Sequence, residues 1–192
     1  MDKTCAIMLA DGFETIEALA PCDVLRRAGV KTTLAGCCGS RTVTSAQGVV
    51  VTCDATVEEL DLAEYDLMVT PGGAEGVKRL GENDAVMTAL AARMDRGALV
   101  GSICAAPSLL ATLKKLDRRV ATCYPGWETD FPAGVRPADN GVYVDGNLIT
   151  GSGPAFAVPF GLALAVALVG KDEAERVAAG MLVPDTAWGC IH

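Results

Sequence analysis

Histidine is almost absent from this chain of 192 residues, and the single one, His192, is the last residue. A Cys-His or Ser-His hydrolase would have to recruit it from a terminus, and termini are usually mobile, so such a site is disfavoured. The eight cysteines include no Cys-x-x-Cys pair, the common spacing of a zinc site, so no metal is expected. Most of these thiols are expected to be small, reduced core residues.

Positive charge is scarce as well: the chain has 16 Lys and Arg but 24 Asp and Glu, which gives a net charge of −8. Nucleic acids and anionic membranes bind to clustered cations, so neither partner is expected. The uncharged stretch 148–170 leaves only 156–169 for a helix, which is shorter than the roughly 20 residues of a membrane span. No signal peptide is recognisable, so we expect a cytoplasmic protein.

Two phosphate-binding devices are also missing: a Gly-x-x-x-x-Gly-Lys loop and a dinucleotide fingerprint after the first expected strand. No cofactor is therefore expected. Apolar residues, in contrast, make up 51% of the chain, enough for a large core in one domain over residues 1–192.

Short apolar runs alternate with helical patterns along the chain, which predicts an α/β fold with a mostly parallel sheet between two helix layers. The expected strands are 5–10, 31–35, 65–70 and 99–103, with hairpins at 43–53 and 142–150 and a further short run at 120–123 before a Pro- and Gly-rich crossing. The expected helices are 14–28, 84–96, 106–116, 156–169 and 172–181.

The corner after the strand 99–103 is the first candidate site. Here Cys104 stands between a strand and a helix, and the residues two before and two after it, Ser102 and Ala106, are small. This resembles a nucleophile elbow, whose sharp turn demands small neighbours. The following helix terminus would favour the thiolate, so the pKa of Cys104 is predicted to fall below its usual value of about 8.5. The alternative is a core cysteine at a strand end.

Two further motifs follow expected strands, and ligands bind beyond the carboxyl ends of parallel strands. Glu14 and Glu17 are three residues apart and share one helix face, where Glu17 could reach Cys104. They could equally be ordinary acidic residues of a first helical turn. Gly72 and Gly73 could point N–H groups at an oxyanion, or form a plain turn.

Taken together and in this order, the motifs resemble the ThiJ/PfpI superfamily, and most closely its DJ-one branch, the group of the parkinsonism-associated deglycase. The resemblance covers about residues 4–183. It rests on ADGFETIE at 10–17, DVLRRAG at 23–29, PGG at 71–73, ICAAP at 103–107 and SGP at 152–154. It implies a class I glutamine amidotransferase-like (flavodoxin-like) three-layer fold and a homodimer.

The resemblance also implies roles. Cys104 would be the nucleophilic, oxidation-sensitive cysteine, and Glu17 the carboxyl that hydrogen-bonds its sulfur. A buried carboxyl beside a thiolate should keep its proton, because two adjacent negative charges repel. The anion and substrate site would comprise Gly72, Gly73, Ala105, Glu14, Tyr124 and Pro154.

Two departures from the family pattern restrict the activity. Members of the protease-like branch have a histidine directly after the cysteine, where this chain has Ala105, so peptidase activity is not expected. Other relatives place a histidine in a later loop, where this chain has Tyr124, which can donate a hydrogen bond but is a poor base.

The leading hypothesis is therefore a cofactor-independent glyoxalase or deglycase that acts on small reactive carbonyls, for example converting methylglyoxal to lactate. The alternative is a redox sensor or stress chaperone that works through oxidation of Cys104. A third reading is a scaffold that has lost its activity, since the imidazole is missing.

Overall fold

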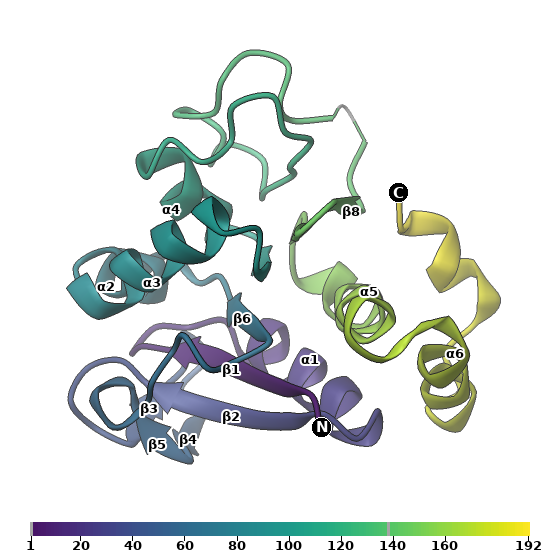
Figure 1. The fold of residues 1–192 in the computed structure, drawn as a ribbon, viewed down its shortest axis with the longest axis horizontal. Coiled ribbons are helices and arrows are strands. Elements are labelled where there is room, and N and C mark those ends of the chain that lie inside the picture. Colours follow the sequence, from purple (N-terminus) through teal and green to yellow (C-terminus); the bar gives the residue numbers. More distant parts are fainter. Residues whose placement is uncertain (1, 138) are drawn as a thin grey trace.

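The computed structural model describes residues 2–137 and 139–192. Within them, seven strands form one sheet in the order β5-β2-β1-β6-β7-β9-β8 (Figure 1). The strands are β1 (Thr4–Leu9), β2 (Lys31–Gly36), β5 (Ala55–Thr56), β6 (Leu67–Thr70), β7 (Leu99–Ile103), β8 (Val142–Asp145) and β9 (Leu148–Gly151). All neighbours are parallel except β8 and β9, the predicted hairpin. The predicted, mostly parallel sheet is confirmed.

Helices cover both faces of the sheet, which explains why β1 and β6 are apolar almost throughout. Figure 1 shows α1, α5 and α6 on one side and α2, α3 and α4 on the other. The helices are α1 (Thr15–Arg27), α2 (Ala74–Gly81), α3 (Asp84–Asp95), α4 (Pro107–Thr112), α5 (Ala157–Val169) and α6 (Lys171–Gly180). No described helix is long and apolar enough to cross a membrane; the uncharged α5 packs against α1 instead.

The first predicted hairpin is also confirmed, as β3 (Thr42–Thr44) paired with β4 (Val50–Thr52) in a small separate sheet. Its loop lies against the start of α1, where the Thr15 hydroxyl contacts Ser45 Oγ at 2.8 Å and donates to Gln47 Oε1 at 2.7 Å. The hairpin therefore borders the end of the sheet where α1 begins.

Several sequence-based predictions were wrong in detail. The helix expected over 106–116 ends at Thr112, because Lys114 takes a left-handed φ of 56° that closes the helix. Residues 120–123 form no strand: the Thr122 N–H donates to the Thr150 hydroxyl rather than to a strand backbone. The strand β5, the helix α2 and the final turn η3 (Asp185–Cys190) were not foreseen.

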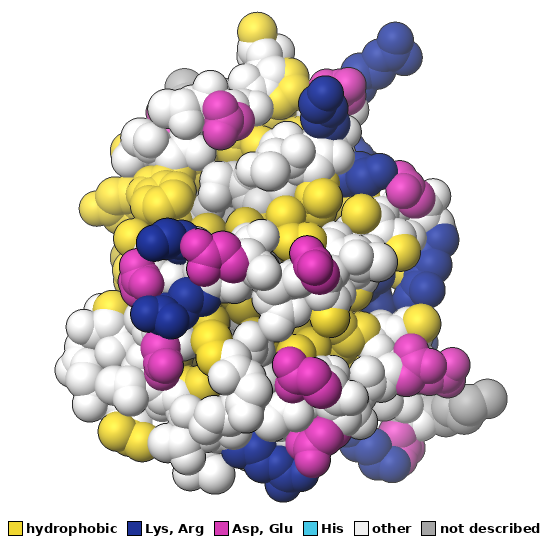
Figure 2. Space-filling view, turned by 90° about the vertical axis from the view of Figure 1, so that its left-hand side faces the viewer, with side chains coloured by type: hydrophobic (Ala, Val, Ile, Leu, Met, Phe, Trp, Pro, Cys, Tyr) yellow, Lys and Arg dark blue, Asp and Glu magenta, His cyan; other side chains and the backbone are white. Residues whose placement is uncertain are grey.

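Acidic and basic side chains are both scattered over the face on the left-hand side of Figure 1, with hydrophobic side chains between them (Figure 2). The ion pairs that Lys3, Arg26 and Arg41 form with carboxylates are about half exposed, so each stabilises the fold little.

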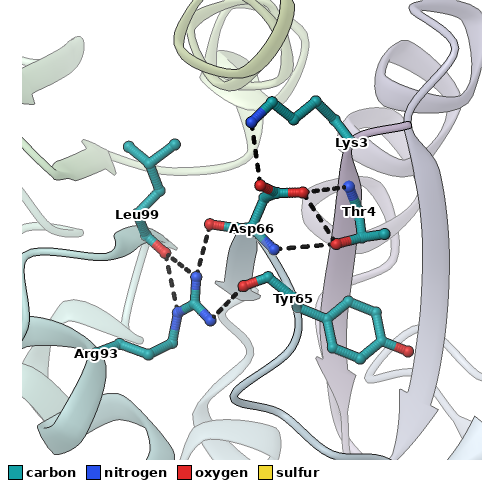
Figure 3. Close-up of polar contacts among 6 residues, drawn as sticks. All are labelled: Lys3, Thr4, Tyr65, Asp66, Arg93 and Leu99. Atoms are coloured by element: carbon teal, nitrogen blue, oxygen red, sulfur yellow. Dashed lines mark hydrogen bonds and ion pairs between the residues drawn. The ribbon is translucent and has the colours of Figure 1, made fainter. Parts of the chain in front are cut away.

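One buried side chain ties together the starts of three central strands (Figure 3). Arg93 of α3 is 1% exposed and donates to the carbonyl oxygens of Leu99 at 3.0 Å, Tyr65 at 2.8 Å and Asp66 at 2.7 Å. The Asp66 carboxylate accepts the Thr4 N–H at 2.9 Å. Because Thr4 begins β1, Asp66 precedes β6 and Leu99 begins β7, these contacts hold all three strands to α3. No sequence pattern had marked Arg93.

We predict that Arg93→Met lowers the free energy of unfolding by about 3 kcal/mol or more, because several buried carbonyl oxygens lose their donors. Urea denaturation measures the change. Arg96→Met is the matched control, since Arg96 is the C-cap of the same helix, is exposed and donates one side-chain hydrogen bond, to Ala63. If the two variants were equally stable, the contacts of Arg93 would not have this importance.

Candidate active site

The corner after β7 has the backbone of a nucleophile elbow. Cys104 follows β7 directly and has a φ of 63°, in the left-handed region that side-chain-bearing residues rarely adopt. Two hydrogen bonds fix this conformation: the Cys104 N–H donates to Gly151 O, and the Tyr124 N–H donates to Cys104 O, both at 2.9 Å. The chain turns here from strand to helix and leaves the thiol at the carboxyl end of the sheet.

The carboxyl group of Glu17 is brought to the same place by the first turn of α1. Glu17 is fully buried, and its Oε2 accepts the Gly72 N–H at 2.9 Å. Glu14 is the N-cap of α1, and its side chain accepts the Glu17 N–H at 2.9 Å. The two acids therefore differ in position: Glu14 caps the helix at the rim of the site, while Glu17 points inward.

Gly72 lies between the carboxyl and the thiol, so close to both that no side chain fits. A Cβ atom at this position would be 2.5 Å from Glu17 Oε2 and 2.6 Å from Cys104 Cβ. The next residue, Gly73, has a φ of 93°, and a Cβ there would lie 2.3 Å from Gly12 O. Both glycines are thus required by close packing and, at Gly73, by backbone conformation.

Burial determines the electrostatics of the pair. It raises the pKa of Glu17 to about 7, and the contact with Cys104 and the Gly72 N–H only partly offset it. Burial and then the neighbouring Glu17 carboxylate raise the pKa of Cys104 to about 12, against the N–H groups of Ala105 and Gly73, which lower it. The sequence-based prediction of a lowered pKa for Cys104 is therefore wrong, because burial and the carboxylate outweigh the donors.

The pair instead keeps one proton over a wide pH range, between the two pKa values of about 7 and about 12. Glu17 Oε1 is buried and has no nitrogen or oxygen partner among the described residues. This oxygen can carry the shared proton and donate it to the sulfur, with which the carboxyl interacts. When the carboxyl holds the shared proton the sulfur is a thiolate, and the Ala105 and Gly73 N–H groups face it.

Tyr124 and Pro154 come together in a hollow of about 230 Å³ next to this corner. The Tyr124 side chain is partly exposed, and its backbone is bound to Cys104. Asn140 and Phe156 line the same hollow. Sequence reasoning missed both, since neither belongs to a motif. Only for Phe156 was there a signal, because it follows the SGP segment closely in the sequence.

His192 lies away from the thiol. The tail folds back along the outer edge of β8, where Ile191 bridges Val142 and the imidazole stacks on Tyr143 with ring centroids 4.9 Å apart. In the order β7-β9-β8-tail, His192 is three strand spacings, about 14 Å, from the strand of Cys104. Among the described residues, no group of three His, Cys, Asp or Glu side chains could hold a metal ion.

The fold and this corner define a class of protein: an α/β sandwich with a cysteine at a nucleophile elbow and a buried carboxyl beside it. The model of the DJ-1/PfpI family matches residues 3–167. The chain is 36% identical over 184 residues to protein dj-1beta of Drosophila melanogaster, covering 95% of this chain and 98% of the fly protein. The chain therefore belongs to the DJ-1/PfpI family.

Two further relatives agree with this assignment. The chain is 28% identical over 176 residues to the glutathione-independent glyoxalase DJR-1.2 of Caenorhabditis elegans, covering 91% of this chain and 94% of the nematode protein. The solved structure of oxidized DJ-1 from Toxoplasma gondii superposes with a TM-score of 0.89 at 31% identity, over 94% of this chain and 98% of that one.

The raised pKa of Glu17 predicts how stability depends on pH. Folding raises this pKa from 4.5 to about 7, so the folded protein binds the proton more tightly, and the stabilisation is lost as the pH rises through 7. Each pKa unit is worth about 1.4 kcal/mol. Between pH 4.5 and about 7, the ionisation of Glu17 should therefore lower the free energy of unfolding by about 3 kcal/mol. Urea denaturation at several pH values measures it.

In Glu17→Gln this component of the pH dependence should disappear, while Glu64→Gln, at an exposed site, should keep the wild-type slope. An unchanged slope in Glu17→Gln would show that Glu17 does not bind its proton more tightly in the folded protein.

Proposed function

We propose that this protein is a cofactor-independent enzyme that acts on small reactive carbonyls, with Cys104 as nucleophile and Glu17 as proton carrier. The observation that supports this most strongly is the buried pair itself: a thiol and a carboxyl that interact with each other, both packed against Gly72, with one proton to share. A relative named a glutathione-independent glyoxalase supports the same chemistry.

For a 2-oxoaldehyde the proposed steps balance as follows. The Cys104 thiolate attacks the aldehyde carbon and its oxygen takes the proton from Glu17, giving a hemithioacetal. The Glu17 carboxylate then removes the proton from that carbon, giving an enediol in which the proton of the first hydroxyl passes to the oxygen of the neighbouring carbon. Glu17 returns its proton to that neighbouring carbon, and the first carbon becomes the carbonyl of a 2-hydroxy acid thioester. Water hydrolyses the thioester, releasing the acid and restoring the pair. Methylglyoxal would thus give lactate.

The surroundings of the pair suit these steps. The Ala105 and Gly73 N–H groups, which face the sulfur, are donors for an oxygen that gains negative charge beside it. Ala105 stands where a protease-like relative has histidine, so we propose no peptidase activity. A deglycase would use the same nucleophile and the same proton carrier.

The test is lactate formation from methylglyoxal by the purified wild-type protein and two variants. Cys104→Ser removes the nucleophile and Glu17→Gln the proton carrier, so each should lower kcat/KM by about 100-fold or more. In the wild type, kcat/KM should rise as the pH passes about 7, where the pair loses its first proton. Activity that survives in Cys104→Ser would overturn the proposal.

A second candidate function is redox sensing or a stress-chaperone role through oxidation of Cys104. Cys104 is 9% exposed and its sulfur faces N–H donors that could bind a sulfinate, while Cys5 and Cys22 lie deeper in the core. In this case peroxide should oxidise Cys104 first, as read by peptide mass spectrometry, with no turnover of methylglyoxal. Equal oxidation of the other thiols would contradict it.

We also propose that the protein is a cytoplasmic homodimer. An apolar surface supports the dimer: Ile16 at the start of α1 and Val49 and Val50 of the adjacent hairpin are 49%, 42% and 63% exposed. Apolar side chains gathered on a surface are typical of protein interfaces. Val50→Lys should halve the molar mass measured by light scattering; a wild-type monomer would exclude the dimer.

A further inference from the structure

The hollow beside Cys104 has a composition that is unusual for so acidic a chain. It is lined by Tyr124, Asn140, Ser152, Gly153, Pro154 and Phe156, together with Pro125 and Ala155. Every lining residue that the structure describes is uncharged, although the chain has 40 charged residues and a net charge of −8, counted from its 16 cationic and 24 acidic residues. The hollow therefore offers aromatic and apolar walls with few polar groups.

Its position makes it part of the same site. Gly151 pairs with Ile103 in the sheet and accepts the Cys104 N–H, so Ser152 and Gly153 run past the cysteine at about one strand spacing, roughly 5 Å. On the other side, Tyr124 is bound to the Cys104 carbonyl. Cys104 does not itself line the hollow, but both walls are joined to its backbone, so a substrate bound at the sulfur has its other end beside the hollow.

The polar groups of the lining are mostly engaged. Ser152 Oγ accepts the Gly141 N–H at 2.9 Å and contacts the Thr122 hydroxyl at 2.8 Å. Asn140 Oδ1 accepts a hydrogen bond from Arg136 at 3.3 Å. Arg136 does not line the hollow; its charge also acts on Glu128, and its buried Nε has no partner among the described residues. Because Arg136 reaches the hollow only through Asn140, a carboxylate or phosphate in the hollow would lose its hydration without touching a cation of the lining.

We infer that this hollow is the subsite for the substrate's side chain, and that it selects carbonyl compounds with an aryl or branched alkyl group over those with a carboxylate or phosphate. This inference rests on the proposed carbonyl chemistry at Cys104. The volume of about 230 Å³ is below the roughly 300–1,000 Å³ usual for ligand pockets, so the substrate is small. The rings of Tyr124 and Phe156 are the specificity-determining groups.

Gly153 provides a substitution that changes the hollow without straining the backbone. Its φ of 166° is extended, which any residue adopts. A Cβ at this position would lie 3.2 Å from Tyr124 Cδ2, so in Gly153→Ala the tyrosine ring has to shift by a few tenths of an ångström, and the methyl group narrows the hollow. Gly180→Ala is the matched control, because nothing lies within 4 Å of its Cβ position.

The first experiment measures binding without chemistry. Saturation-transfer NMR on the Cys104→Ser protein compares acetophenone, an unreactive aryl ketone, with 4-acetylbenzoate, which adds one carboxylate to the same ring. Acetophenone should bind, and 4-acetylbenzoate about tenfold or more weaker. Phe156→Ala and Gly153→Ala, each added to Cys104→Ser, should weaken acetophenone binding about threefold or more, and Gly180→Ala should not.

The second experiment measures turnover by the wild-type protein at initial rates. The ratio of kcat/KM for phenylglyoxal to that for methylglyoxal should fall in Phe156→Ala and in Gly153→Ala, relative to Gly180→Ala. Equal binding of both ketones, or no effect of either subsite variant, would overturn the inference. If methylglyoxal is not turned over but the ketone results hold, the proposed reaction fails and the subsite stands.

Discussion

The close approach of three chain segments around Gly72 is the constraint on which the site depends. The end of β6, the first turn of α1 and the corner after β7 meet at a point where a single Cβ would touch both the Glu17 carboxyl and Cys104. Such contact is possible only if the three parallel strands hold their register, and the register is fixed at the opposite end of the sheet by Arg93. The Arg93 contacts and the Glu17–Cys104 pair therefore lie at opposite ends of the same three strands and depend on the same register, although they share no side chain.

The chemistry of the pair follows from burial more than from the helix terminus. Donors at Ala105 and Gly73 favour a negative sulfur, but burial and the Glu17 carboxylate oppose it more strongly. A thiolate is compatible with this site only when Glu17 holds a proton. In the proposed carbonyl chemistry, the carboxyl is then the group that donates and accepts the proton that has to move. The same arrangement would stabilise an oxidised sulfur, so both candidate functions use one geometry and differ in what reaches it.

Access to the pair is decided by a different set of residues. Tyr124, Gly153 and Phe156 come from the crossing after α4 and the loop after β9, and none of them contributes to the core register. Residues of this kind can change from one relative to another without disturbing the strands.

The sequence by itself determined the alternation of strands and helices, the two hairpins and the elbow at Cys104, because period, turn residues and small neighbours are local properties. It also brought Glu17 and Gly73 to the correct edge of the sheet, since parallel strands end together. Only the tertiary structure decided the rest. The pKa of Cys104 depends on burial, the importance of Arg93 depends on carbonyl groups up to 31 residues away, and the hollow is built from loops with no periodic signal. The short strand β5 and the helix α2, with a glycine inside it, are stabilised by neighbours rather than by their own sequence.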